Sequence, residues 1–168
     1  MASEEHDTPS DESAKQCGLY RTTSELAEHP GSIGPNMLVY YHNHSDQGPP
    51  IVLLPEQNTN NKWRFHRNGY SVTDPNYIAS LQPLKPEGMY RFRDHFHPDE
   101  QRIVASNALV QLGYNTSAEP IVFFPTYRAD DNALVFPSSG MRVPPKIYAL
   151  LEQLDTRGPR QQQQRQLH

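Results

Sequence analysis

The sequence of 168 residues has a single cysteine, Cys17, and therefore no pair of thiols that could form an internal disulfide. A lone cysteine fits a reducing compartment, and we expect a cytoplasmic location. The chain also lacks a run of about eighteen apolar residues, the length that a membrane-spanning helix needs, so we expect no membrane span. The first sixteen residues are acidic and polar, without the apolar stretch of a signal peptide.

Apolar residues are scarce as well, at 35% of the chain, whereas the sixteen prolines are many. This composition favours a loop-rich β protein with short strands over a helical bundle. Residues 1–16 and 156–168 have too few apolar side chains to offset the entropy of ordering, which predicts two disordered tails. The net charge of −4 does not provide the basic surface that non-specific nucleic-acid binding requires, so a nucleic-acid partner is disfavoured.

What the sequence does contain is an internal repeat. The segment that starts at Gly18 matches the segment that starts at Gly88, in constant order and at an almost constant offset along the chain. This predicts a tandem duplication with copies at residues 17–86 and 87–155. The matching pairs are Gly18 and Gly88, Tyr20 and Tyr90, Arg21 and Arg91, Asn36 and Asn107, Val39 and Val110, Pro50 and Pro120, Val52 and Val122, Phe65 and Phe136, Gly69 and Gly140, Val72 and Val143, and Tyr77 and Tyr148.

Within the first copy, β-rich runs at residues 18–23, 37–41, 50–55 and 62–65 are separated by turn-forming residues. Asn68-Gly69 is a strong hairpin signal. Asp74 and Pro75 then suit the N-cap and first position of a short helix. In the second copy the corresponding segment, residues 144–154, has one isoleucine and three leucines at helical spacing, Ile147, Leu150, Leu151 and Leu154. The long loops after the first strands have apolar residues that predict anchoring to the core, namely Leu26, Ile33, Phe96 and Ile103.

The segment "KWRFHRNGYSVTDPNYIASL", residues 62–81, resembles the end of a Src-homology-3 barrel: an aromatic strand, a tight turn with glycine, then P-x-Y-like residues. "GLYRTT" before a long loop resembles the opening strand of that fold. The resemblance implies two tandem small β-barrels, one in each copy and each ending in a short helical segment. It also implies a peptide-binding groove lined by Tyr20, Trp63, Pro75 and Tyr77.

A barrel of this size buries too little surface to be stable alone. Residues 51–54 and 121–124 are apolar throughout, although a half-exposed strand should alternate apolar and polar side chains. Both faces of these strands are therefore expected to be covered. The short linker favours packing of the two copies with pseudo-two-fold symmetry, and a homodimer is the alternative.

A metal-site motif also occurs in the first copy. His42, His44 and Asp46 have the H-x-H-x-D spacing that resembles the first ligands of a metallo-β-lactamase-type site. The second copy has no histidine or carboxylate at the matching residues 113–117, so the fold does not need a metal there. Because Gln47 follows where that motif has histidine, we disfavour a hydrolase and expect no enzyme activity.

A second H-x-H pair, His95 and His97, lies in a different loop. If the two loops met, His42, His44, His95 and His97 would supply four imidazoles to a zinc or nickel ion. Exposed loop histidines without a metal are the favoured interpretation, and no cofactor is expected. Cys17, at the start of a strand, is interpreted as a small buried apolar residue.

We predict a non-enzymatic protein-interaction or adaptor module with a protein or peptide partner. The first copy has more large aromatic side chains than the second, and aromatic residues dominate interface energetics. The predicted partner-binding residues are Tyr20, Tyr40, Tyr41, Trp63 and Tyr77.

Two other functions stay open. One is the metal-binding protein or hydrolase described above. The other is a nucleic-acid-binding tandem barrel, since small barrels bind nucleic acids with aromatic faces and basic strands. Its candidate residues are Arg64, Arg67, Arg91, Arg93, Tyr70, Tyr90 and Phe92.

Overall fold

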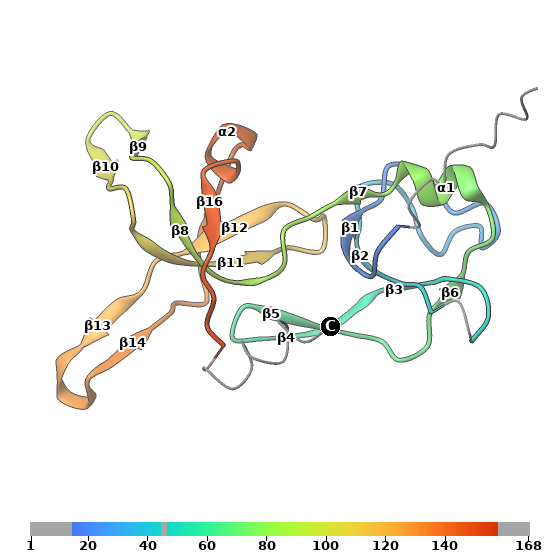
Figure 1. Cartoon of the computed structure of the whole chain (residues 1–168), viewed down its shortest axis with the longest axis horizontal. Coiled ribbons are helices and arrows are strands. Elements are labelled where there is room, and N and C mark those ends of the chain that lie inside the picture. The colour runs from blue at the N-terminus through green and yellow to red at the C-terminus, as the bar shows by residue number, and fades with distance from the viewer. Residues whose placement is uncertain (1–14, 45–46, 158–168) are drawn as a thin grey trace, which may run out of the picture.

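The computed structural model describes residues 15–44 and 47–157, which form a mainly β fold with only short helices (Figure 1). The predicted mainly β class is confirmed. The strands form two groups that lie next to each other along the longest axis of the molecule, which we call unit one (residues 17–86) and unit two (residues 87–155). The predicted tail disorder falls mostly on residues 1–14 and 158–168, which lie outside the described residues.

Unit one contains a five-stranded antiparallel sheet with the strand order β6-β3-β2-β1-β7 and a separate two-stranded hairpin, β4–β5. The sheet order places the first two strands at the centre. Its elements are β1 (Gly18–Arg21), β2 (Leu38–His42), β3 (Ile51–Leu53), β4 (Pro55–Thr59), β5 (Lys62–Phe65), β6 (Tyr70–Ser71), α1 (Pro75–Ser80) and β7 (Gln82–Pro83).

Unit two contains a five-stranded antiparallel sheet with the order β15-β12-β11-β8-β16 and two separate hairpins, β9–β10 and β13–β14. Its elements are β8 (Gly88–Phe92), β9 (Phe96–Asp99), β10 (Arg102–Val104), β11 (Leu109–Tyr114), β12 (Pro120–Phe123), β13 (Thr126–Arg128), the 3-10 turn η1 (Ala129–Asp131), β14 (Ala133–Val135), β15 (Met141–Arg142), α2 (Pro145–Tyr148) and β16 (Leu151–Gln153).

The two sheets correspond strand by strand, and their registers agree. Gly18 is opposite Tyr41 in unit one, and Gly88 is opposite Leu112 in unit two, so residues matched in the repeat pair with each other in the same way. Two matched asparagines, Asn36 and Asn107, both have left-handed backbone conformations, with φ of 57° and 65°. Short polar side chains tolerate this conformation better than other non-glycine residues do.

Each unit has its own cluster of buried apolar residues. In unit one, Leu26 and Ile33 are fully buried, as predicted for the loop between β1 and β2. In unit two, Phe96 is buried with the sheet residues, but Ile103 is 61% exposed, so its predicted anchoring role is wrong. The reason is that residues 96–104 form their own hairpin, β9–β10, in place of a loop that lies on the core.

The helix at the end of unit one forms as predicted. Asp74 is its N-cap and accepts a hydrogen bond from the Asn76 backbone N–H, and Pro75 is the first helical residue. In unit two α2 ends at Tyr148, and Leu151 belongs to β16, where it pairs with Phe92. Sheet pairing therefore overrides the helical spacing of the leucines. Neither helix in the described part of the chain has the length and apolarity to cross a membrane.

The expected barrel closure is not observed. Among the described residues, β6 does not pair with β7 in the first sheet, and β15 does not pair with β16 in the second. Both sheets are therefore open. Strand β12 is covered on both faces, as expected, because the neighbours Val122 and Phe123 are both buried. In strand β3 only Val52 is buried, so the expected cover on both faces is not found there.

The expected pseudo-two-fold packing is also contradicted by the contacts. A two-fold axis makes every contact reciprocal. Here Leu38 of β2 is fully buried in the apolar cluster of unit two, whereas its counterpart Leu109 is half-buried and belongs to neither buried cluster. Unit one thus contributes to the core of unit two without a matching contribution in return.

Candidate functional site

The contact between the units is built around hairpin β4–β5 of unit one, which lies against unit two (Figure 1). The Trp63 indole N–H donates a hydrogen bond to the Tyr114 carbonyl at 2.7 Å, and the ring packs on the apolar cluster of unit two. The Asn61 side chain donates to the Gln111 side chain and to the Pro137 carbonyl, both at 2.9 Å. These bonds fix the hairpin in one position.

Gly113 explains how the hairpin can approach so closely. A Cβ atom at Gly113 would lie 2.8 Å from the Asn61 carbonyl oxygen, a separation that real Cβ atoms do not tolerate. The corresponding residue of unit one is His42, which has a large side chain at this place. The difference accounts for the one-directional contact, because only unit two offers the space for a hairpin.

A groove of about 500 Å³ lies between the sheet of unit one, hairpin β4–β5 and the linker. Its walls carry the Tyr40, Trp63, Phe65 and Leu84 side chains, and the Tyr40 and Phe65 rings are 5.7 Å apart. Glu87 is the acidic residue in this lining. A groove with aromatic walls and some polar groups is typical of a binding site for a small ligand or a peptide side chain.

Burial raises the pKa of the Glu87 carboxyl to about 7, although hydrogen bonds from the Trp63 backbone N–H and the charge of Lys62 act in the opposite direction. The Trp63 N–H lies 3.1 Å from one carboxyl oxygen and 3.3 Å from the other. Loss of water around the carboxyl therefore outweighs these favourable contacts.

This raised pKa predicts a pH-dependent stability. The folded chain binds the Glu87 proton more tightly than the unfolded chain does, so the stabilisation is complete below pH 4.5 and is lost as pH rises to 7. We expect wild type to lose about 1 kcal/mol more than Glu87→Gln between pH 5 and pH 8, since partial exposure weakens the effect. Urea unfolding of both proteins across this range measures it, and parallel pH profiles would contradict the assignment.

The five predicted partner-binding residues divide into two groups. Tyr20, Tyr41 and Tyr77 are buried in the core of unit one, each no more than 6% exposed. Tyr40 and Trp63 are half-buried and face the groove, which Tyr20 also lines at its edge. Partner binding by these residues stays a prediction. Tyr40 and Trp63 are the two whose side chains are partly accessible to a partner.

The four candidate histidines do not converge. His42 and His44 lie together, with ring centroids 4.0 Å apart, and the His95 and His97 rings form a separate pair 6.2 Å apart. Within residues 15–44 and 47–157, the grouping that brings three metal-ligating side chains together is Cys17, His42 and His44. The four-imidazole arrangement is therefore absent from the described chain, and Asp46 lies outside it.

The side chain of Cys17 is exposed, so the sequence-based interpretation of Cys17 as a buried apolar residue is wrong. It precedes β1, and its sulfur accepts a hydrogen bond from the Asn43 backbone N–H at 3.1 Å. The sequence contains no signal that joins Cys17 to the H-x-H motif. That link depends on the pairing of β1 with β2, which brings residue 17 opposite residue 42.

Sequence reasoning also missed the apolar surface of hairpin β13–β14. Tyr127 is 61% exposed, Leu134 50% and Val135 38%, and they form most of the large exposed apolar side chains in the described chain. Tyr127 and Leu134 are directly opposite each other and so share one face of the hairpin. The sequence signal that could have indicated this surface is the difference between the two copies: Tyr127 of unit two matches the polar Gln57 of unit one.

Comparisons with protein-family models, with curated proteins and with solved structures found no match for this chain.

Proposed function

We propose that the chain is a non-enzymatic protein-interaction module, an adaptor that contains two copies of one small Src-homology-3-like unit. The corresponding strand orders and the agreement of register support the duplication. In support of the resemblance, each unit has an opening strand and a short helix near its end. The aromatic strand that carries the resemblance, residues 62–65, lies in hairpin β4–β5 and not in the five-stranded sheet.

The observation that carries the proposal is the contrast between the two corresponding hairpins. Hairpin β4–β5 is docked on unit two through Trp63, whereas hairpin β13–β14 projects from the far side of unit two, away from unit one (Figure 1). Leu134 is the counterpart of Trp63 and is half exposed. An isolated two-stranded hairpin is only marginally stable in water. We infer that β13–β14 docks on a partner protein as β4–β5 docks on unit two.

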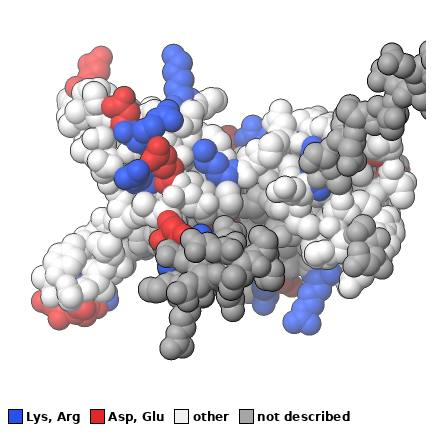
Figure 2. Space-filling model, viewed as in Figure 1, with Lys and Arg blue, Asp and Glu red and all other residues white. Residues whose placement is uncertain are grey.

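The chemistry of this hairpin suits a protein surface. The Tyr127 hydroxyl donates to the Asn132 side chain at 2.7 Å, which holds the ring at the surface of the hairpin. Arg128 forms an ion pair with Asp131 at the tip. The visible face of the hairpin is otherwise largely uncharged (Figure 2). An aromatic and an aliphatic side chain surrounded by polar groups is the usual composition of an interface core and its rim.

Nucleic-acid binding is less well supported. Of the candidate arginines, Arg64 forms an ion pair with Glu56 and Arg91 with Glu152, each at 3.0 Å. Acidic and basic side chains are interspersed on the visible face of unit two and do not separate into a basic patch (Figure 2). The carboxylate in each ion pair partly neutralises the arginine, which weakens its attraction to a phosphate backbone.

The test compares wild type with the double variant Tyr127→Ser, Leu134→Ser. Ile103→Ser is the matched control, because Ile103 is equally exposed but lies on β10. Each immobilised protein is incubated with soluble extract of the native host, and the melting temperature is measured in parallel. We expect one partner bound stoichiometrically by wild type and control, lost in the double variant, with stability changes within ~0.5 kcal/mol.

Two results would contradict the proposal. One is equal capture of the same partner by the double variant. The other is the absence of any stoichiometric partner together with a purely monomeric chain in sedimentation velocity. Self-association of wild type that the double variant loses would identify the partner as a second copy of this chain.

A further inference from the structure

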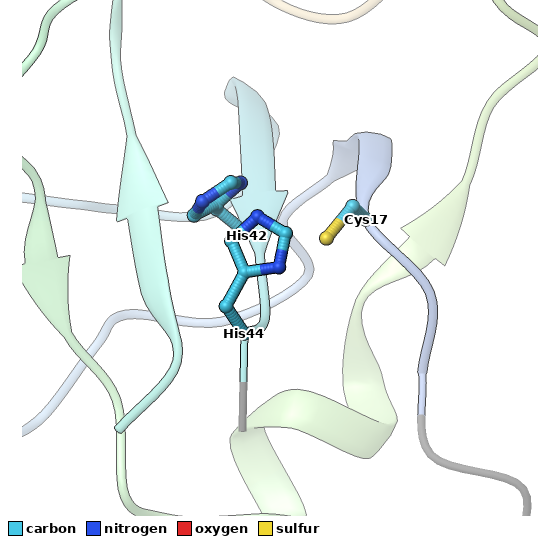
Figure 3. A group of neighbouring side chains, drawn as sticks. All are labelled: Cys17, His42 and His44. Atoms are coloured by element: carbon cyan, nitrogen blue, oxygen red, sulfur yellow. The ribbon is translucent and has the colours of Figure 1, made fainter. Parts of the chain in front are cut away.

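The Cys17, His42 and His44 side chains converge at one end of the unit-one sheet (Figure 3). β1 and β2 are antiparallel, with Gly18 opposite Tyr41, so the same register places Cys17 across from His42. His44 follows two residues later, on the same side of the extended chain as His42. Three residues from two neighbouring strand ends thus share one space.

The distances suit a metal ion. One potential ligand atom from each of the three side chains lies within 4.8 Å of the other two. Zinc bound by one sulfur and two imidazole nitrogens in tetrahedral geometry holds its ligand atoms about 3.5 Å apart. Cys17 and His44 are exposed, and His42 is half-buried, so small side-chain rotations can close the remaining gap without disturbing the core.

The backbone next to the sulfur provides it with a hydrogen-bond donor. The Asn43 N–H donates to the Cys17 sulfur at 3.1 Å, whereas the contact from the thiol to the Asn43 carbonyl is longer, at 3.6 Å. The first of these bonds persists when the thiol loses its proton. The thiolate is the species that binds metals, and hydrogen bonds to ligand atoms orient and tune them.

The fold that the two units share does not require these three side chains. The matching residues of unit two are Glu87, Gly113 and Asn115, and hairpin β4–β5 is bonded to that corner through Trp63. Unit two therefore folds with a docked hairpin where unit one has two imidazoles and a thiol. The side chains of the unit-one corner are instead left accessible to an ion from solvent.

We propose that Cys17, His42 and His44 bind one Zn²⁺ ion. A thiolate with two imidazoles is a ligand set that zinc takes in proteins, and three protein ligands leave a fourth position for water or for a donor from a partner. The ion replaces the thiol proton on Cys17, while both histidines bind as neutral imidazoles.

The experiment uses the full chain, stripped of metal with a chelator and kept reduced. Zn²⁺ affinity and stoichiometry are measured by competition with a chromophoric chelator, and Co²⁺ is used as a spectroscopic probe. We expect one equivalent of zinc, and Co²⁺ spectra with a sulfur-to-cobalt charge-transfer band and the intense d–d bands of tetrahedral coordination.

Cys17→Ser and the double variant His42→Ala, His44→Ala should each weaken zinc binding by about 100-fold or more, because loss of a direct ligand costs more than loss of an outer partner. The double variant His95→Ala, His97→Ala is the matched control and should bind as wild type does. All the variants should keep the melting temperature of the metal-free wild type, since none of the altered side chains belongs to a buried apolar cluster.

The proposal is overturned if the wild-type chain binds no stoichiometric zinc, or if binding survives both Cys17→Ser and loss of the His42 and His44 imidazoles. A Co²⁺ complex without the charge-transfer band would overturn the role of Cys17, independently of how the variants fold.

Discussion

Replacing Trp63 with alanine should lower the free energy of unfolding by about 3 kcal/mol. The indole packs on the apolar cluster of unit two and donates its N–H to the Tyr114 carbonyl, so truncation leaves both a cavity and an unpaired acceptor. The expected loss is at the lower end of the usual range for tryptophan because the side chain is half-buried. Urea unfolding followed by circular dichroism measures the loss.

Leu134→Ala provides the matched control, because Leu134 occupies the same position in the free hairpin and is 50% exposed. Its truncation should change stability by no more than ~0.5 kcal/mol. Trp63→Phe separates the two contributions, since it keeps apolar contact but removes the indole donor, at a cost of about 1 kcal/mol.

An alanine variant of Trp63 that unfolds like wild type would show that hairpin β4–β5 is not fastened to unit two in solution. Trp63 would then be free to act as an anchor for a partner, which the excess of aromatic side chains in the first copy suggests. Because Trp63 is the sole tryptophan, its fluorescence in wild type reports on this same contact directly.

The central strands of both sheets can be predicted from sequence because β-rich runs recur at matched positions, whereas a hairpin such as β9–β10 lies in a segment expected to be a loop. The same information fails at turns. Asn68-Gly69 predicts a tight hairpin, yet Gly69 does not have a positive φ and lies just before β6. The tight turn is at Asn60 and Asn61, with φ of 51° and 64°, where two adjacent asparagines provide a weaker form of the same signal.

The relation between the units could not be predicted, because it depends on a contact between residues that are far apart in the sequence. Gly113 matches His42 in the repeat, but its importance appears only when the Asn61 carbonyl is placed next to it. A symmetric repeat favours the expectation of symmetric packing. The docked hairpin needs glycine at residue 113, whereas the matching residue of unit one is His42.

Only two of the three residues of the metal-binding candidate can be predicted from sequence, for a similar physical reason. The spacing of His42 and His44 is visible in the sequence, whereas Cys17 lies before β1, far from both, and joins them only through strand pairing. His95 and His97 have the same spacing but no thiol beside them, and they belong to the segment of hairpin β9–β10 in unit two. Local spacing indicates which residues share a side of a strand, and pairing decides which strands meet.

The matched glycines Gly69 and Gly140 allow a direct test of whether the units are built alike. A Cβ at Gly69 would lie 2.6 Å from the Val52 carbonyl oxygen, and a Cβ at Gly140 would lie 2.6 Å from the Val122 carbonyl oxygen. A side chain is equally close at each position, Leu53 at Gly69 and Ile121 at Gly140, but the backbone oxygen cannot rotate away as a side-chain end can. Each glycine therefore lets the following strand, β6 or β15, approach its neighbour closely.

Gly69→Ala and Gly140→Ala should each lower the free energy of unfolding by about 2–3 kcal/mol, because the strand pair must separate to admit the methyl group. Gly34→Ala is the matched control: apart from its chain neighbours, no atom lies within 4 Å of its Cβ position, so alanine should leave stability unchanged or slightly higher. Urea unfolding of the three variants tests the expectation. If one of the two matched glycines tolerates alanine while the other does not, the units differ in the packing that a common origin requires, and the proposed duplication loses its strongest structural support.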